Sequence, residues 1–178
     1  MKKKILSLVL MLSMLVSLTL LTAGCSAPAS TVKADVPKAA EALWNAGSTR
    51  DKIVVISDLH LGIDDRYTET LHNIPFLIDF LKRLQSTKDV RELVIAGDFL
   101  DEWFLPVYYP VYTDQKKFYK DVIANNQDVI DELNKVIDSG IKLVYVIGNH
   151  DMTLEAEVLQ QAIPKIVQVS DAKGLGAY

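Results

Sequence analysis

The chain has 178 residues, of which 19 are basic and 23 are acidic, giving a net charge of −4. Its length suits one domain of ordinary size, and its 49% hydrophobic residues exclude global disorder. A single cysteine excludes both an intramolecular disulfide framework and a cysteine-rich zinc module. The acidic balance, without a basic stripe, argues against binding to nucleic acid.

The first 24 residues are predicted to be a secretory signal. Lysines at positions 2–4 precede an uncharged apolar run over residues 5–21, and small residues then lead to Cys25. Small residues before a cysteine resemble the bacterial lipobox, so we expect lipidation at Cys25 and an anchor on the extracytoplasmic face of the bacterial membrane. An ordinary signal peptide and a retained membrane anchor are the alternatives. Residues 25–50 are predicted to be a tether.

Strand and helix patterns alternate from residue 51 onward. Short β-branched runs predict strands buried on both faces, and apolar residues at helical spacing predict the helices between them. The predicted strands are 53–56, 93–96, 143–147 and 166–169. The predicted helices are one beginning near Pro75, one long helix over 122–137 that Gly140 ends, and one from Thr153 to about Ala162. This order indicates an α/β fold with a parallel sheet covered on both faces.

Each of the first three predicted strands ends in polar residues. Ligands of open α/β sheets bind beyond the carboxyl ends of the strands, so these segments are expected to meet there. They are Ser57-Asp58-Leu59-His60, Gly97-Asp98 and Gly148-Asn149-His150-Asp151.

These residue types suit a divalent cation. Asp58 and His60 are two residues apart, so on an extended segment their side chains would point the same way. Asp98 adds a carboxylate that can bridge two ions, and Asn149 adds an amide oxygen. Helix capping is the alternative for any single aspartate. Three clusters at the same end of successive strands favour a metal site.

The motifs Asp58-Leu59-His60, Gly97-Asp98 and Gly148-Asn149-His150-Asp151 resemble the first three motifs of the calcineurin-like metallophosphoesterases, over about residues 51–169. The resemblance implies the N-terminal portion of a two-sheet αββα sandwich. It implies that Asp58 and His60 bind a first metal, that Asp98 bridges both metals and that Asn149 binds the second. It also implies that His150 acts near the leaving group and that Asp151 orients His150.

The resemblance implies a hydrolase of phosphate esters, which could be phosphomonoesters, diesters or pyrophosphates. The family uses two divalent ions and a metal-bound hydroxide, and Mn, Fe or Zn would suit these ligands. The run from Gly97 to Trp103 is similar to the diacylglucosamine pyrophosphatase branch, which implies a lipid-linked or nucleotide substrate. The alternative is a noncatalytic surface lipoprotein or binding module that keeps half of the fold.

Metal ligands from the family's second half have no counterpart here, because no histidine follows His150. We therefore expect residues 51–178 to be an incomplete domain with an exposed sheet face or edge, weak stability and little or no activity. A second chain could complete it.

Two features after Asp98 have more than one interpretation. Asp101 could accept a hydrogen bond near the site or begin a helix. An aromatic group follows it, and could either receive an apolar part of the substrate or pack its own rings against the sheet. The group comprises Trp103, Phe104, Tyr108, Tyr109 and Tyr112.

Overall fold

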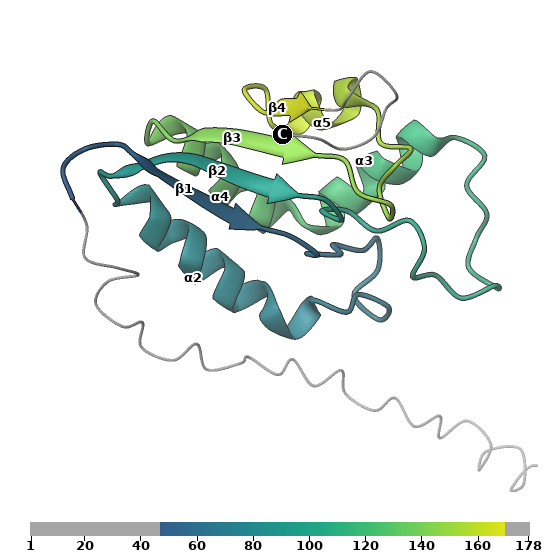
Figure 1. The fold of residues 1–178 in the computed structure, drawn as a ribbon. Helices are drawn as coiled ribbons and strands as arrows, with labels where there is room; N and C mark the ends of the chain where they lie inside the picture. The colour runs from purple at the N-terminus through teal and green to yellow at the C-terminus, as the bar shows by residue number, and fades with distance from the viewer. Residues whose placement is uncertain (1–46, 170–178) are drawn as a thin grey trace, which may run out of the picture. The chain divides into compact units, whose positions relative to one another are not determined.

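The computed structural model describes residues 47–169, which form a four-stranded parallel sheet in the order β1-β2-β3-β4 (Figure 1). This confirms the predicted α/β class. The strands are β1 (Lys52–Ile56), β2 (Val90–Ala96), β3 (Lys142–Val146) and β4 (Val167–Val169). The predicted signal, Cys25 and most of the predicted tether lie outside the described residues.

Helical segments connect the strands. They are the short 3-10 turn η1 (Leu71–Asn73) and the helices α2 (Ile74–Gln85), α3 (Gln115–Asn125), α4 (Gln127–Asp138) and α5 (Ala156–Ala162). Pro75 lies in the first turn of α2, as predicted. Within residues 47–169, none of these helices is both long enough and apolar enough to cross a membrane.

The prediction of one long helix before β3 is wrong, because α3 and α4 are separate helices that meet at Asn126. Its backbone lies at φ −115° and ψ 29°, outside the helical region. The buried Asn126 side chain donates to the carbonyl oxygens of Val122 and Gly62, each at 2.8 Å. An asparagine side chain that bonds the backbone in this way competes with the helical hydrogen bonds. The break also ties α3 to the loop after β1.

The start of the last helix also differs from the prediction. Glu155, and not Thr153, is the residue before α5, and its side chain makes no cap hydrogen bond. The Thr153 hydroxyl is used elsewhere, because it donates to Glu102.

The core lies between β2 and β3 and the helices α2 and α4, which pack against each other along one face of the sheet (Figure 1). Alternate strand residues point to this face. Full burial of such a side chain stabilises the fold by about 1.5–3 kcal/mol. The fully buried members include Leu81, Leu84, Leu93, Ile95, Ile130, Leu133, Leu143 and Tyr145.

Strand β1 is not buried on both faces as predicted. Val54 and Ile56 pack against the core, whereas Ile53 is 47% exposed and Val55 is 60% exposed on the opposite face. An exposed apolar face is therefore present at β1, which lies at the edge of the described sheet.

The strand register brings the strand ends to one edge of the sheet. Ile56 of β1 pairs with Ile95 of β2, and Ala96 of β2 pairs with Val146 of β3. Because the three strands are parallel and end within about one residue of each other, the loops that follow them begin side by side.

Candidate metal centre

Backbone hydrogen bonds join the loops after β1 and β2. The N–H groups of Leu59 and His60 both donate to the carbonyl oxygen of Asp98, each at 2.9 Å. The loop after β3 joins them, because the His150 N–H donates to Oδ1 of Asp98 at 3.0 Å. Asp98 therefore holds all three loops together through its backbone and one carboxylate oxygen.

Three candidate ligands have left-handed backbone conformations. Among the non-glycine residues that the structure describes, only Asp58 (φ 55°), His60 (φ 45°) and Asp98 (φ 49°) have positive φ. Such conformations cost on the order of 1–3 kcal/mol each and concentrate at functional sites. The expected extended conformation of Asp58 and His60 is thus wrong, although the two side chains still meet.

Asp58, His60 and Asp98 form a group that could hold a metal ion. One donor atom from each lies within 4.8 Å of the other two. The Nε2 atom of His60 is 3.9 Å from Oδ1 of Asp58 and 3.9 Å from Oδ2 of Asp98. One imidazole nitrogen and two carboxylate oxygens fit a divalent transition metal. The Asp58 side chain is 69% exposed, so the group faces solvent on that side.

Asn149 is exposed and directly precedes His150, whose N–H bonds the Asp98 carboxylate. This places Asn149 in the loop that touches Asp98. Its role as a metal ligand stays a prediction.

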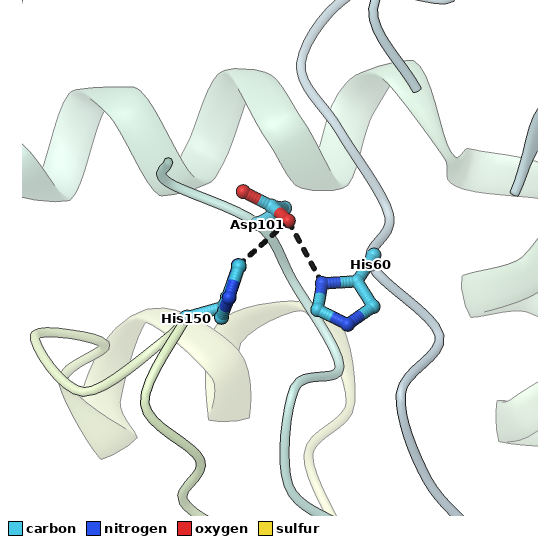
Figure 2. Close-up of side chains that lie close together, drawn as sticks. All are labelled: His60, Asp101 and His150. Carbon is cyan, nitrogen blue, oxygen red and sulfur yellow. Dashed lines mark hydrogen bonds and ion pairs between the residues drawn. The ribbon is translucent and has the colours of Figure 1, made fainter. Parts of the chain in front are cut away.

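Asp101 lies between the two histidines, as Figure 2 shows. Its Oδ2 atom is 2.8 Å from Nδ1 of His60 and 3.0 Å from Nδ1 of His150. An ionised carboxylate only accepts hydrogen bonds, so each imidazole donates through Nδ1. The Nε2 atom of His60 is then the nitrogen that faces Asp58 and Asp98, which is the arrangement that orients a histidine ligand.

The other oxygen of Asp101 holds the chain that follows it. Oδ1 accepts hydrogen bonds from the N–H groups of Trp103 (2.7 Å) and Phe104 (2.9 Å). Burial raises the pKa of Asp101, but the bonds from these two N–H groups and from the imidazoles of His60 and His150 outweigh it. The net pKa of Asp101 therefore lies below its ordinary value of 3.8. The interpretation of Asp101 as a hydrogen-bond acceptor at the site is confirmed. The interpretation as a helix start is wrong, because the residues that follow Asp101 form a loop.

His60, Asp101 and His150 also form a group whose donor atoms lie close enough to hold a metal. The Asp101 carboxylate, however, already forms a hydrogen bond of ordinary length with each of the two imidazoles. We therefore interpret this second group as the support for His60 and His150.

Asp151 does not hold the His150 ring in the way the resemblance implied. Its side chain is fully buried, and it accepts hydrogen bonds from the backbone N–H groups of Gly148, Phe99 and Leu100. Burial raises the pKa of Asp151 above its ordinary value of 3.8. Asp151 thus joins the loops after β2 and β3, and Asp101 is the carboxylate that bonds the His150 imidazole.

The aromatic residues after Asp101 also contact the site. The Trp103 ring lies 4.3 Å from the His150 ring between centroids, and the Phe104 ring stacks at 5.9 Å. The sequence did not predict that Trp103 and Phe104 contact His150. The available signal was the group of aromatic residues that follows the predicted ligand Asp98.

No curated protein matches this chain in a sequence search. The family model for the calcineurin-like phosphoesterases matches residues 51–174, a segment that contains Asp58, His60, Asp98 and His150. Because this match covers more than half of the 178 residues, the chain belongs to the calcineurin-like phosphoesterase family.

Proposed function

We propose that this protein hydrolyses phosphate esters with divalent cations held at Asp58, His60 and Asp98. Membership of the family gives the reaction class, which is metal-dependent hydrolysis of phosphoesters. The observation that carries the proposal is the convergence of these three donor atoms within 4.8 Å, on backbone held in left-handed conformations. Strain of this kind persists where the surrounding structure enforces it, which is typical of functional sites.

The proposed site takes two ions. Asp58, His60 and Asp98 would hold the first, while Asp98 and Asn149 would contribute to the second. Mn, Fe or Zn suits a mixture of imidazole, carboxylate and amide donors. When bound, such ions polarise phosphoryl oxygens and lower the pKa of water.

His150 is proposed to act on the leaving group. Its Nδ1 donates to Asp101, so Nε2 is the nitrogen available to a ligand. A protonated imidazole can donate from Nε2 to a leaving oxygen, and the Asp101 carboxylate stabilises the positive ring. Ring contacts with Trp103 and Phe104 also help to position the His150 imidazole.

The test uses the full chain and the variant Asp98→Asn. Mn²⁺ binding is measured by calorimetry, and turnover is measured with p-nitrophenyl phosphate and bis(p-nitrophenyl) phosphate. We expect weak Mn²⁺-dependent turnover in the parent chain, in keeping with the incomplete ligand set expected from the sequence. Asp98→Asn should lose this turnover, although its amide oxygen can still accept the bond from His150. The control is Asp138→Asn, because the Asp138 side chain is 69% exposed and pairs with Lys165, away from the three loops.

This experiment has three possible outcomes, and each leads to a different conclusion. Mn²⁺-dependent turnover that only Asp98→Asn abolishes would support the proposal. Mn²⁺ binding without turnover would favour the noncatalytic binding module instead. A parent chain that binds no divalent cation would overturn the metal site itself.

The proposal includes a membrane anchor at Cys25. Its support is the sequence alone: three lysines, an apolar run and small residues before the single cysteine. Metabolic labelling with a radioactive fatty acid in a bacterial host should mark the parent chain and leave Cys25→Ser unlabelled. Equal labelling of both would contradict the anchor.

A further inference from the structure

An open hollow of about 400 Å³ lies beside the candidate metal centre. Trp103 belongs to both, because it lines the hollow and its ring packs against the His150 ring at 4.3 Å. The adjacent Glu102 also lines the hollow, and its N–H donates to the His150 carbonyl oxygen at 3.1 Å. The volume is within the range of small-molecule sites, which is about 300–1,000 Å³. A ligand at His150 could therefore extend into the hollow.

Most of the residues that line the hollow have aliphatic or aromatic side chains, with Leu105, Pro106, Tyr109, Val111, Tyr112 and Phe118 among them, and polar atoms of Glu102 and Gln115 also reach it. Aromatic and aliphatic walls bind neutral rings and chains through surface burial and ring contacts.

Contacts within the wall and to residues outside the hollow hold this wall in place. The Tyr109 ring packs edge-on against Tyr67 at 6.0 Å between centroids. The Tyr112 hydroxyl donates to Asp121 at 2.7 Å, and the Tyr112 ring packs edge-on against Phe118 at 5.2 Å. A wall that is already ordered reduces the entropy that ligand binding would otherwise cost.

The charge of the hollow indicates what it can accept. Its lining residues, all within the described part of the chain, include no lysine or arginine, and Glu102 is the charged one. Oε2 of Glu102 accepts bonds from Gln115 (2.6 Å), Tyr119 (2.8 Å) and Thr153 (2.5 Å).

Lys117, whose Nζ lies 5.4 Å from the centroid of the Tyr112 ring, is paired with Asp121. A second phosphate would therefore meet the Glu102 carboxylate without a lysine or arginine from the lining, which is unfavourable. A neutral group fits better.

We infer that the hollow binds the neutral apolar or aromatic group of an ester whose phosphoryl group lies at Asp58, His60 and Asp98. This inference rests on the proposed function and narrows its substrate class. It favours esters of apolar or aromatic alcohols over nucleoside diphosphates. Trp103 forms the shared boundary, because it contacts both His150 and the hollow.

The test compares two phosphonates that share one anionic head group and resist hydrolysis. Binding of phenylphosphonate and methylphosphonate to the full chain is measured by calorimetry with Mn²⁺ present. We expect phenylphosphonate to bind about tenfold more tightly, as expected for partial burial of one ring.

Matched variants locate the effect. Val111 is 88% exposed and lines the hollow, whereas Val107 is fully exposed on the same loop and does not line it. Val111→Asp should reduce the preference for phenylphosphonate to within about twofold, since a new anion there disfavours an apolar ring. Val107→Asp should keep the preference. Tyr109→Ala, which removes part of the wall, should act like Val111→Asp.

The possible results separate the inference from the proposed function. Equal Mn²⁺-dependent binding of both phosphonates would overturn the inference and leave the proposed function standing. Loss of the preference in Val107→Asp to the same extent as in Val111→Asp would also overturn it. If neither phosphonate binds with Mn²⁺, both the proposed function and the inference fail.

Discussion

The Nδ1 atom of His60 lies 2.8 Å from Oδ2 of Asp101. This bond fixes which nitrogen of His60 faces Asp58 and Asp98, and thereby prepares the Nε2 lone pair for a cation. The same oxygen of Asp101 also accepts the bond from His150. One carboxylate therefore orients a candidate metal ligand and a candidate proton donor together.

Replacing Asp101 by asparagine should weaken metal binding while keeping the fold. The amide has one acceptor oxygen and one donor group, so it cannot accept from both imidazoles and still bond the N–H groups of Trp103 and Phe104. We expect Mn²⁺ affinity to fall by about 10- to 100-fold, the usual effect of losing a partner that orients a ligand. Calorimetry measures the affinity, and circular dichroism checks the fold.

The control for Asp101→Asn is Asp51→Asn. The Asp51 side chain is 66% exposed and contacts Lys52, so its loss should leave Mn²⁺ affinity unchanged. Parent-like affinity in Asp101→Asn would show that His60 does not need this carboxylate.

Gly148 should not tolerate a side chain. A Cβ atom there would overlap Oδ1 and the backbone nitrogen of Asp98. Gly148→Ala should therefore displace Asp98, lower Mn²⁺ affinity and reduce the free energy of unfolding by about 1–3 kcal/mol, as overpacking does. Calorimetry and urea denaturation measure the two effects.

Gly47→Ala is the matched control, because the nearest atom to a Cβ there is Nζ of Lys52 at 4.0 Å. Equal behaviour of the two alanine variants would mean that the close approach of Gly148 to Asp98 has no role in binding.

Much of this arrangement could be predicted from the sequence. The β-branched runs located the strands, and the parallel order implied that their polar ends would meet at one edge. That reasoning brought Asp58, His60 and Asp98 together without a structure, because register and strand direction set where a loop begins. The contact does not depend on the extended backbone that was assumed for Asp58 and His60.

The remaining features depend on contacts that no local pattern encodes. The break between α3 and α4 follows from the bond of Asn126 to Gly62, which is distant in sequence. The same reason applies to Asp101, which had two interpretations, and to Asp151, to which the resemblance gave the role of orienting His150. Both aspartates lie in loops, and only the fold decides which one reaches an imidazole. Exposure of Val55 depends on which elements cover each face of the sheet.

The ion pair at Glu132 predicts how stability depends on pH away from the metal centre. Hydrogen bonds from Lys135 (2.9 Å) and then Gln85 (2.7 Å) lower the pKa of Glu132 below 4.5, although burial opposes them. The folded state thus releases this proton at lower pH than the unfolded state. Its stabilisation is full above the unfolded value and is lost as pH falls through the folded pKa.

Glu132→Gln should remove this contribution. We expect the variant to unfold at lower urea concentration than the parent near neutral pH and to lose less stability between about pH 5 and 3. Glu157→Gln is the control, because the Glu157 side chain is 71% exposed. A parent-like loss of stability in Glu132→Gln at acid pH would assign the effect to other carboxylates.

Asp151 is predicted to stabilise the fold, and replacing it should reveal this role. The Asp151 carboxylate accepts hydrogen bonds from the backbone N–H groups of Gly148, Phe99 and Leu100. In Asp151→Asn, an NH₂ group replaces one of the two accepting oxygens, so at least one of these N–H groups would lose its acceptor. A buried donor left unpaired costs about 1–3 kcal/mol, so the free energy of unfolding should fall by that amount. Urea denaturation followed by fluorescence measures it.

Asp128→Asn on α4, which retains an acceptor in the first turn of that helix, serves as the comparison. If Asp151→Asn keeps the parent's unfolding free energy but alters the titration of His150 in NMR spectra, then Asp151 acts on the imidazole after all. The hydrogen bonds argue against this result, because both Asp151 oxygens bond backbone amides and the His150 Nδ1 already bonds Asp101.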